Sequence, residues 1–314
     1  GAGAGGAAPP GRPAGAGAPD TGGSARIPAA LVGVVGFKAS RALPVDGVLP
    51  LAPTLDHLGW CTRDVATATR VAAALGLANG TASAARPLAD RVAGAADPAG
   101  PADQAGPADQ AGPADQAGPA GQLGAPPWLG VLAAARDLAE PDVRAAFDRA
   151  TAAATAAGAR ITVIDWPYLD LVTAVTTTIM FAEAALEFGA PELPYGDDVA
   201  DRLRQGMTVS ARAYLAARRL GDLLSARFDA LTDGLAGILA PTTGMTAPSF
   251  DAVGRPGVVP ALLRVTRLDD LTGRPALSLP LPGSSGSLPV GLHVTGRTDR
   301  DLLTLAAWLE RVVA

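Results

Sequence analysis

Residues 128–166, WLGVLAAARDLAEPDVRAAFDRATAAATAAGARITVIDW, decide the fold class of this chain. The runs at 128–135 and 160–166 are short and apolar, which is typical of buried strands. Between them, residues 141–158 place apolar side chains at helical spacing. The residues that share one face of this helix are Val143, Ala146, Phe147 and Ala150. A strand, a helix and a second strand in this order predict an α/β layer architecture.

Similar patterns along the chain predict the remaining elements. Apolar runs predict strands at residues 32–38, 237–243, 275–281 and 289–296. Helical spacing predicts helices at residues 62–77, 168–188, 210–232 and 301–313. In the helix at 210–232, Ser210 is expected to cap the N-terminus, and Arg218 and Asp222 are expected to form an outward i,i+4 pair.

Two segments have a composition that cannot supply a core. Residues 1–19 are Gly, Ala and Pro with one Arg, and we expect them to be disordered because they bury too little apolar surface. Residues 80–126 contain the unit GPADQA three times, and a repeat without apolar side chains has no face to stack. We therefore expect one domain over residues 20–314, interrupted by a flexible insertion at 80–126.

Composition excludes several classes of function. The net charge of −5 leaves no basic surplus for phosphates, which argues against nucleic-acid binding. One cysteine, Cys61, excludes an internal disulfide, and two histidines make a metal cage unexpected, so we expect no cofactor or metal. We find no apolar run of 18 residues and no signal-peptide pattern, and therefore expect a cytoplasmic protein without a membrane span. The oligomeric state is not indicated.

The chemically informative segment is residues 20–28, DTGGSARIP. Two glycines before Ser24 allow a tight turn, which can aim backbone N–H groups at one point beside the hydroxyl. Such donors stabilise an oxyanion, and one donor can contribute about 3 kcal/mol to catalysis. In a glycine-rich region the Gly-Gly-Ser triplet alone is a weak signal.

The sequence around this triplet resembles the amidase signature family of amide hydrolases. The resemblance covers roughly residues 20–78 and 128–314. It is carried by residues 20–76, 237–251 and 271–310, with Leu-Thr-Gly, Pro-Ala-Leu-Ser and Pro-Val-Gly-Leu patterns. It implies a three-layer α/β/α fold around a mixed sheet, and a small-molecule amide as substrate. It also implies that Ser24 is the nucleophile and that Arg26 supports the loop. The implied oxyanion hole consists of the backbone N–H groups of Thr21, Gly22, Gly23 and Ser24.

Two catalytic groups of the family are missing from this chain. The family uses an upstream Lys as base and a bridging Ser that relays the proton, and water then hydrolyses the acyl-enzyme. No Ser precedes Ser24, and the one Lys, Lys38, follows it at a position that differs from that of the base. His57 is the best substitute base, although we interpret His57, His293 and Cys61 as structural. We therefore expect a chain that is incomplete at its N-terminus and inactive alone.

Alternatives remain open at this point. The chain could instead be a degenerate, non-catalytic relative that acts as a binding or scaffold protein. A transfer-RNA amidotransferase subunit is less favoured, because that subunit has Arg-Gln-Pro after its nucleophile and Ile27 stands in place of the Gln. Met180, Phe181 and Tyr195 are candidates for the wall of the acyl pocket, and core packing explains them equally well. Asp269 and Asp270 replace an aromatic and an amide residue, which could alter the mouth of the substrate cavity.

Overall fold

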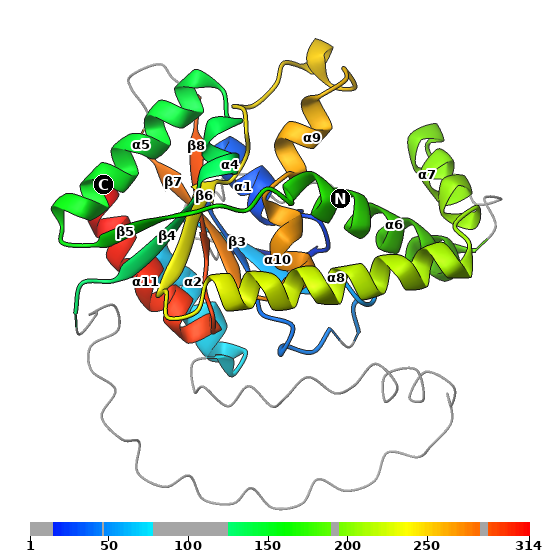
Figure 1. Cartoon of the computed structure of the whole chain (residues 1–314), viewed down its shortest axis with the longest axis horizontal. Helices are drawn as coiled ribbons and strands as arrows, with labels where there is room; N and C mark the ends of the chain where they lie inside the picture. Colours follow the sequence, from blue (N-terminus) through cyan, green and yellow to red (C-terminus); the bar gives the residue numbers. More distant parts are fainter. Residues whose placement is uncertain (1–14, 46, 78–124, 190–194, 283–287) are drawn as a thin grey trace, which may run out of the picture.

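An eight-stranded mixed sheet forms the centre of the molecule (Figure 1). The computed structural model describes residues 15–45, 47–77, 125–189, 195–282 and 288–314. Across the sheet the strands are β1 (Gly15–Asp20), β3 (His57–Thr62), β2 (Val35–Lys38), β7 (Ala276–Leu281), β8 (Val290–Thr295), β6 (Gly237–Pro241), β4 (Trp128–Leu132) and β5 (Arg160–Ile164). Strands β6, β4 and β5 are parallel, and the other neighbours are antiparallel. With helices on both faces, this arrangement confirms the predicted α/β class and its mixed sheet.

One face of the sheet, here called the α11 face, is apolar over most of its width. It is covered by α2 (Val65–Ala74), α5 (Pro141–Ala156) and α11 (Asp299–Val313). Strand side chains with at most 3% exposure on this face are Val35, Phe37, Trp60, Leu129, Leu239, Leu277, Leu279, Leu292 and Val294. Because side chains alternate along a strand, these residues turn their neighbours to the opposite face.

The opposite face, here called the α10 face, has two different halves. It is covered by α1 (Arg26–Val32), α4 (Ala133–Asp137), α6 (Leu169–Phe188), α8 (Ala211–Leu231) and α10 (Thr266–Thr272). Over β4, β5 and β6 the contacts are apolar, with Trp166 packed edge-on to Phe228 at a centroid distance of 5.1 Å. Over β3, β2, β7 and β8 the buried strand residues include five polar ones: Lys38, His57, Ser278, His293 and Thr295. This polar half lies beneath α1 and α10.

Two helices extend the molecule beyond the sheet. Helix α7 (Asp197–Met207) packs against α6, and α9 (Val258–Leu263) precedes α10 (Figure 1). The contact between α6 and α7 is close, because a Cβ at Gly206 would lie 2.0 Å from the carbonyl oxygen of Phe181. Only a glycine fits there without moving one of the two helices.

Most of the elements expected from the sequence are present within the described residues. Ser210 caps α8 as predicted and accepts a hydrogen bond from the N–H of Ala213. The prediction that Arg218 forms an outward pair with Asp222 was wrong. Nη1 of Arg218 lies 3.5 Å from Oε1 of Glu183 on α6, so the side chain of Arg218 points to a neighbouring helix. The sequence did not predict β3, which runs between β1 and β2.

The predicted disorder at 1–19 extends too far. Strand β1 begins at Gly15 and pairs with β3 over its whole length, since backbone pairing needs no large side chains. Residues 1–14 and nearly all of the expected insertion at 80–126 lie outside the described residues.

Helix α6 is an exception to the expectation that no segment is apolar enough to span a membrane. Within the described residues it is long and apolar enough to cross a membrane, with a mean hydropathy of 1.5. Core helices pass the same test, and 44% of this stretch is buried. It also contacts α7, α8 and α10.

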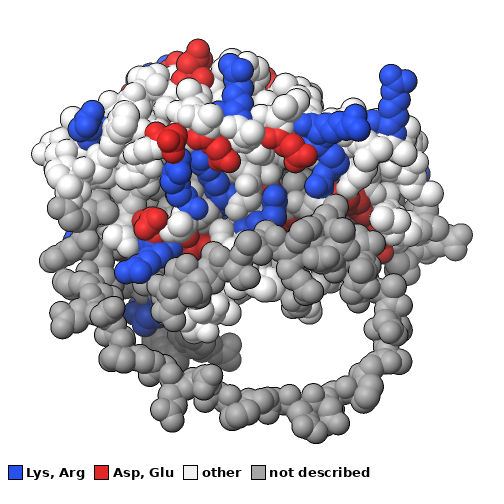
Figure 2. All heavy atoms as spheres, turned by 60° about the horizontal axis from the view of Figure 1, so that its bottom comes forward, with Lys and Arg blue, Asp and Glu red and all other residues white. Residues whose placement is uncertain are grey.

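Charges on the surface are mixed in sign. Figure 2 shows acidic and basic side chains next to one another on the face it presents. Exposed ion pairs such as Arg297–Asp233, with a 2.6 Å contact, are examples of this mixing. Pairs of this kind contribute about 0–1 kcal/mol each, so the surface contributes little to the stability of the fold.

Candidate active site

Ser24 lies in a short loop between β1 and α1 that is otherwise buried. We call residues 21–25 the Ser24 loop. The side chain of Ser24 is exposed, whereas Gly23 and Ala25 on either side of it are buried. The loop therefore presents one hydroxyl group to the outside and fixes the backbone that carries it.

Asp20 holds the backbone of this loop from within. Its carboxylate accepts hydrogen bonds from the N–H of Gly23 at 2.7 Å and from the N–H of Ala25 at 3.2 Å. Gly23 has φ of 112°, and a Cβ there would lie 2.5 Å from Oγ1 of Thr266. A glycine is therefore required by both the backbone conformation and the lack of space.

Arg26 is the centre of a fully buried ion cluster. Its guanidinium donates to Asp20, Asp269 and Asp270, each over 2.9 Å at the closest contact. Burial would raise the pKa of Asp20, but the charge of Arg26 and its hydrogen bonds lower it to about 2. Burial likewise acts against the charge of Arg26, and the carboxylates outweigh it and raise its pKa. The cluster ties the start of α1 to α10, which lies more than 240 residues later in the sequence.

Asp269 connects this cluster to β8. It accepts hydrogen bonds from Nε2 of His293 and from Oγ1 of Thr295, both over 2.7 Å. Burial tends to raise the pKa of Asp269, but His293 and Arg26 lower it. His293 thus has the structural role that the sequence indicated.

A second set of contacts fixes the other side of the Ser24 loop. Oγ1 of Thr21 donates to Asp56 over 2.6 Å, and Asp56 also accepts from two backbone N–H groups. Oγ1 of Thr266 donates to the carbonyl oxygen of Gly22 over 2.8 Å. Asp20 of β1, Asp56 just before β3 and Thr266 of α10 therefore hold the Ser24 loop in place.

Glycines in the sheet allow α1 and the loop to lie directly on it. A Cβ at Gly36 of β2 would lie 2.5 Å from Cβ of Ala29, and one at Gly291 of β8 would lie 2.6 Å from Cβ of Ala30. A Cβ at Gly59 of β3 would be 2.7 Å from a backbone oxygen. The sequence signal for this contact is three glycines within strands, where glycine is otherwise unfavourable.

A family model described as Amidase matches residues 3–94 and 115–305. The chain belongs to the amidase family. It is 26% identical over 310 residues to 2-amino-5-chloromuconic acid deaminase of Comamonas testosteroni, a match that covers 94% of this chain and 59% of that protein. It is 28% identical over 325 residues to a glutamyl-tRNA(Gln) amidotransferase subunit of Desulforamulus reducens, a match that covers 93% of this chain and 62% of that protein.

A solved structure described as an amidase superposes with a TM-score of 0.72 at 28% identity, covering 96% of this chain and 63% of that one. A shorter match, to Amidase 1 of Arabidopsis thaliana, is 46% identical over 57 residues, 18% of this chain and 13% of that protein. The chain thus spans about three-fifths of the length of the relatives that match it broadly.

Two buried bases in this amidase-family chain have partners other than Ser24. Burial lowers the pKa of Lys38 to about 8 against the opposing charge of Asp270, and its Nζ donates to the carbonyl oxygen of Ala39 over 3.3 Å. Burial also lowers the pKa of His57, whose Nδ1 lies 2.7 Å from the carbonyl oxygen of Leu55. Among the described residues, neither group hydrogen-bonds to the hydroxyl of Ser24.

The four residues of the predicted oxyanion hole are consecutive in the Ser24 loop. The N–H of Gly23 donates to Asp20 in this structure, so it is engaged in holding the loop. The role of Thr21, Gly22, Gly23 and Ser24 as oxyanion donors stays a prediction.

The candidate wall residues lie in different places. Cε of Met180 lies 3.4 Å from where a Cβ of Gly22 would be, so this side chain borders the Ser24 loop. Phe181 is at the contact between α6 and α7, and Tyr195 packs edge-on to Phe188 with a centroid distance of 6.4 Å. Asp269 and Asp270 are fully buried with Arg26, so the expectation that they line a cavity mouth was wrong.

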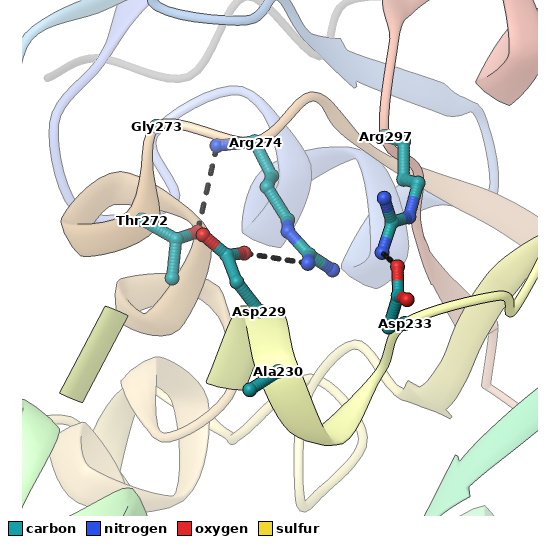
Figure 3. Close-up of a pocket in the computed structure, with 7 residues that line it drawn as sticks. All are labelled: Asp229, Ala230, Asp233, Thr272, Gly273, Arg274 and Arg297. Atoms are coloured by element: carbon teal, nitrogen blue, oxygen red, sulfur yellow. Dashed lines mark hydrogen bonds and ion pairs between the residues drawn. The ribbon is translucent and has the colours of Figure 1, made fainter. Parts of the chain in front are cut away.

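A pocket of about 670 Å³ lies elsewhere, between the end of α8 and the segment after α10 (Figure 3). It is lined by the pairs Arg274–Asp229 and Arg297–Asp233 together with Ala230, Thr272 and Gly273. No residue of the Ser24 loop lines it. Because each arginine already has a carboxylate partner, this pocket is a weak candidate for a substrate site.

Proposed function

We propose that this chain carries the nucleophile of an amide hydrolase and that the nucleophile is Ser24. The observation that carries the proposal is the single exposed hydroxyl on a loop whose backbone is held by Asp20, Asp56 and Thr266. A nucleophile positioned in advance lowers the entropic cost of reaching the attacking geometry. Membership of the amidase family supports the same assignment.

In the proposed reaction, Oγ of Ser24 attacks the carbonyl carbon of the amide and its proton passes to a base. The carbonyl oxygen becomes an oxyanion, which backbone N–H groups of the Ser24 loop stabilise. The C–N bond then breaks, the amine leaves with the proton from the base, and an acyl ester remains on Ser24. A water molecule, deprotonated by the same base, hydrolyses this ester and releases the acid.

The base is the part of this scheme that the described residues do not supply. Lys38 and His57 hydrogen-bond to backbone oxygens, and His293 hydrogen-bonds to Asp269. A serine hydroxyl without a base is a poor nucleophile. We therefore propose that the chain by itself reacts slowly.

Chemical rescue tests both statements. A fluorophosphonate probe should label the chain slowly, and a small primary amine such as methylamine should accelerate labelling by acting as a free base. The variant Ser24→Ala should not be labelled with or without the amine. Labelling that persists in Ser24→Ala would disprove the assignment of the nucleophile, and fast labelling without amine would disprove the missing base.

Failure of rescue would favour the second candidate, a non-catalytic relative that binds a ligand or a partner. The observation behind that candidate is the engagement of the Gly23 N–H and of both buried bases in structural contacts. The amidotransferase relative matches the chain as broadly as the deaminase does. Ile27 remains the reason to favour hydrolysis over amidotransfer.

A further inference from the structure

Arg267 is a buried cation without an ion-pair partner among the described residues. Arg267 is 7% exposed and belongs to α10, a helix that packs against α6 and α8 (Figure 1). Charged side chains are almost never this buried unless they are paired. Arg26, on the same face of the sheet, contacts three carboxylates.

The contacts of Arg267 hold one end of its guanidinium and leave the other end without an acceptor among the described residues. Nη1 donates to Oγ1 of Thr176 over 3.2 Å and to Oγ1 of Thr177 over 2.7 Å. Both hydroxyls donate their own protons to carbonyl oxygens of α6, so each accepts from Arg267 through a lone pair. The two N–H bonds of Nη1 are thereby used.

The Nε and Nη2 groups of Arg267 make no hydrogen bond among the described residues, and Nε is fully buried. These two groups form the edge of a guanidinium that binds a carboxylate through two parallel hydrogen bonds. A buried donor without an acceptor carries the full cost of desolvation, which a bound anion would offset.

Arg267 follows a residue that contacts the Ser24 loop. Thr266 donates a hydrogen bond to the carbonyl oxygen of Gly22, and a Cβ at position 23 would lie 2.5 Å from Oγ1 of Thr266. On α6, Thr177 precedes Met180 by three residues, about 4.5 Å along a helix at 1.5 Å per residue. Met180 in turn borders Gly22. Arg267 is therefore linked to the Ser24 loop through Thr266 on α10 and through Thr177 and Met180 on α6.

Electrostatics around Arg267 also favour an anion. Burial lowers the pKa of Arg267, and the charge of Arg202 on α7 acts in the same direction, against the attraction of Asp270. Asp270 is already bonded to Arg26. Since an arginine stays protonated in proteins, the positive charge must be balanced by another group.

We propose that the Nε–Nη2 edge of Arg267 binds a carboxylate of the substrate, so that the amide cleaved at Ser24 belongs to a short-chain amic acid. Such a molecule carries a carboxylate and an amide on one carbon chain. The inference rests on the proposed function for the cleavage step, whereas the binding step can be measured separately.

Binding of two matched probes to the full chain tests this site. Succinamate carries one carboxylate and one amide, and succinamide has a second amide in place of the carboxylate. By calorimetric titration at low ionic strength, succinamate should bind at least about tenfold more tightly than succinamide. Arg267→Gln should abolish this preference and leave the affinity for succinamide within about twofold of the original.

Three further variants keep the test decisive. Arg144→Gln on α5 is the matched control, because its Nε is also buried without an acceptor but its Nη2 donates to two backbone oxygens. It should leave the preference intact. Arg267→Lys keeps the charge without the double hydrogen bond and should retain only part of the preference. Thr177→Val removes the acceptor of Nη1 and should also reduce it, which covers the case in which Arg267→Gln does not fold.

Equal binding of the two probes, binding of neither probe, or an equal loss of both in Arg267→Gln would overturn the inference. Fluorophosphonate labelling remains the separate readout for Ser24. A carboxylate preference without labelling would contradict the hydrolase proposal and leave the Arg267 site standing.

Discussion

The two faces of the sheet differ in what they bury. On the α11 face, strand residues such as Leu239 and Leu292 pack against α5 and α11 with no polar group between them. On the α10 face, the neighbouring strand positions hold Lys38, His57 and His293, buried just as fully. Strands β2, β3 and β8 therefore supply an apolar core on one side, through Phe37, Trp60 and Leu292, and a polar core on the other.

The difference shows how this fold separates stability from positioning. Apolar packing is not directional and tolerates small shifts, whereas a bonded charge fixes distance and orientation. The Ser24 loop lies over the charged half, where Asp20, Arg26 and Asp269 determine where its backbone runs. The α11 face lies on the other side of the sheet, and its apolar packing provides much of the free energy that keeps the sheet folded.

Removing the central cation should have the largest effect. Arg26→Met removes the cation that three buried carboxylates share, and we expect it to lower the free energy of unfolding by about 3–5 kcal/mol in urea titrations. Arg136→Met is the matched control, because Arg136 pairs with Asp137 and Asp148 at the surface. It should cost less than about 1 kcal/mol. Equal losses in the two variants would remove the distinction between the faces.

A cavity on the α11 face should cost somewhat less and should not depend on pH. Leu239→Ala removes a side chain with no exposure, and we expect a loss of about 3 kcal/mol by urea unfolding. Leu223→Ala, at a position that is 68% exposed, should change stability by less than about 0.5 kcal/mol. A pH-dependent loss in Leu239→Ala would contradict an apolar origin.

Asp20 should control stability in acid. Its pKa of about 2 lies below the ordinary value of 3.8, so its contribution is complete above pH 3.8 and disappears as the pH falls through 2. The contribution amounts to about 2–3 kcal/mol at 1.36 kcal/mol per pKa unit. Urea titrations from pH 7 to pH 2 should show this loss in the native chain and a smaller one in Asp20→Asn. Parallel curves for the two chains would refute the assigned role of Asp20.

Ser24, the proposed nucleophile, should matter least for stability. Ser24 is exposed, so Ser24→Ala should change the free energy of unfolding by less than about 0.5 kcal/mol while it abolishes fluorophosphonate labelling. A loss of several kcal/mol would mean that the hydroxyl belongs to the structural network. That result would move Ser24 from the reactive part of the loop to its anchoring part.

The sequence predicted the apolar packing on the α11 face well. Val143 and Phe147 reveal the buried face of α5 through spacing alone, because helical periodicity is a local property. The resemblance of residues 20–28 to a known motif singled out Ser24, whose role as nucleophile stays a proposal, and Arg26, which lies at the centre of the buried ion cluster. Strand β1 was missed because Gly and Ala carry no pattern that distinguishes a strand from a disordered segment.

The buried ion cluster around Arg26 could not be predicted from local patterns. Asp269 and Asp270 are 243 and 244 residues from Arg26, and nothing within α10 indicates that they meet it. A carboxylate in a sequence is expected at the surface unless a partner is known. The same reasoning applies to Arg267, whose burial becomes informative only when its contacts on α6 are seen.

Gly36, Gly59 and Gly291 have a consequence for how mutations act on this molecule. An added methyl carbon would lie 2.5 Å from Cβ of Ala29 at Gly36, 2.6 Å from Cβ of Ala30 at Gly291 and 2.9 Å from Cβ of Ala25 at Gly59. Such a change introduces no charge. We expect it to push α1 away from the sheet and to move the hydroxyl of Ser24 with it. Substitutions that are usually counted as the mildest would therefore alter chemistry from beneath the site.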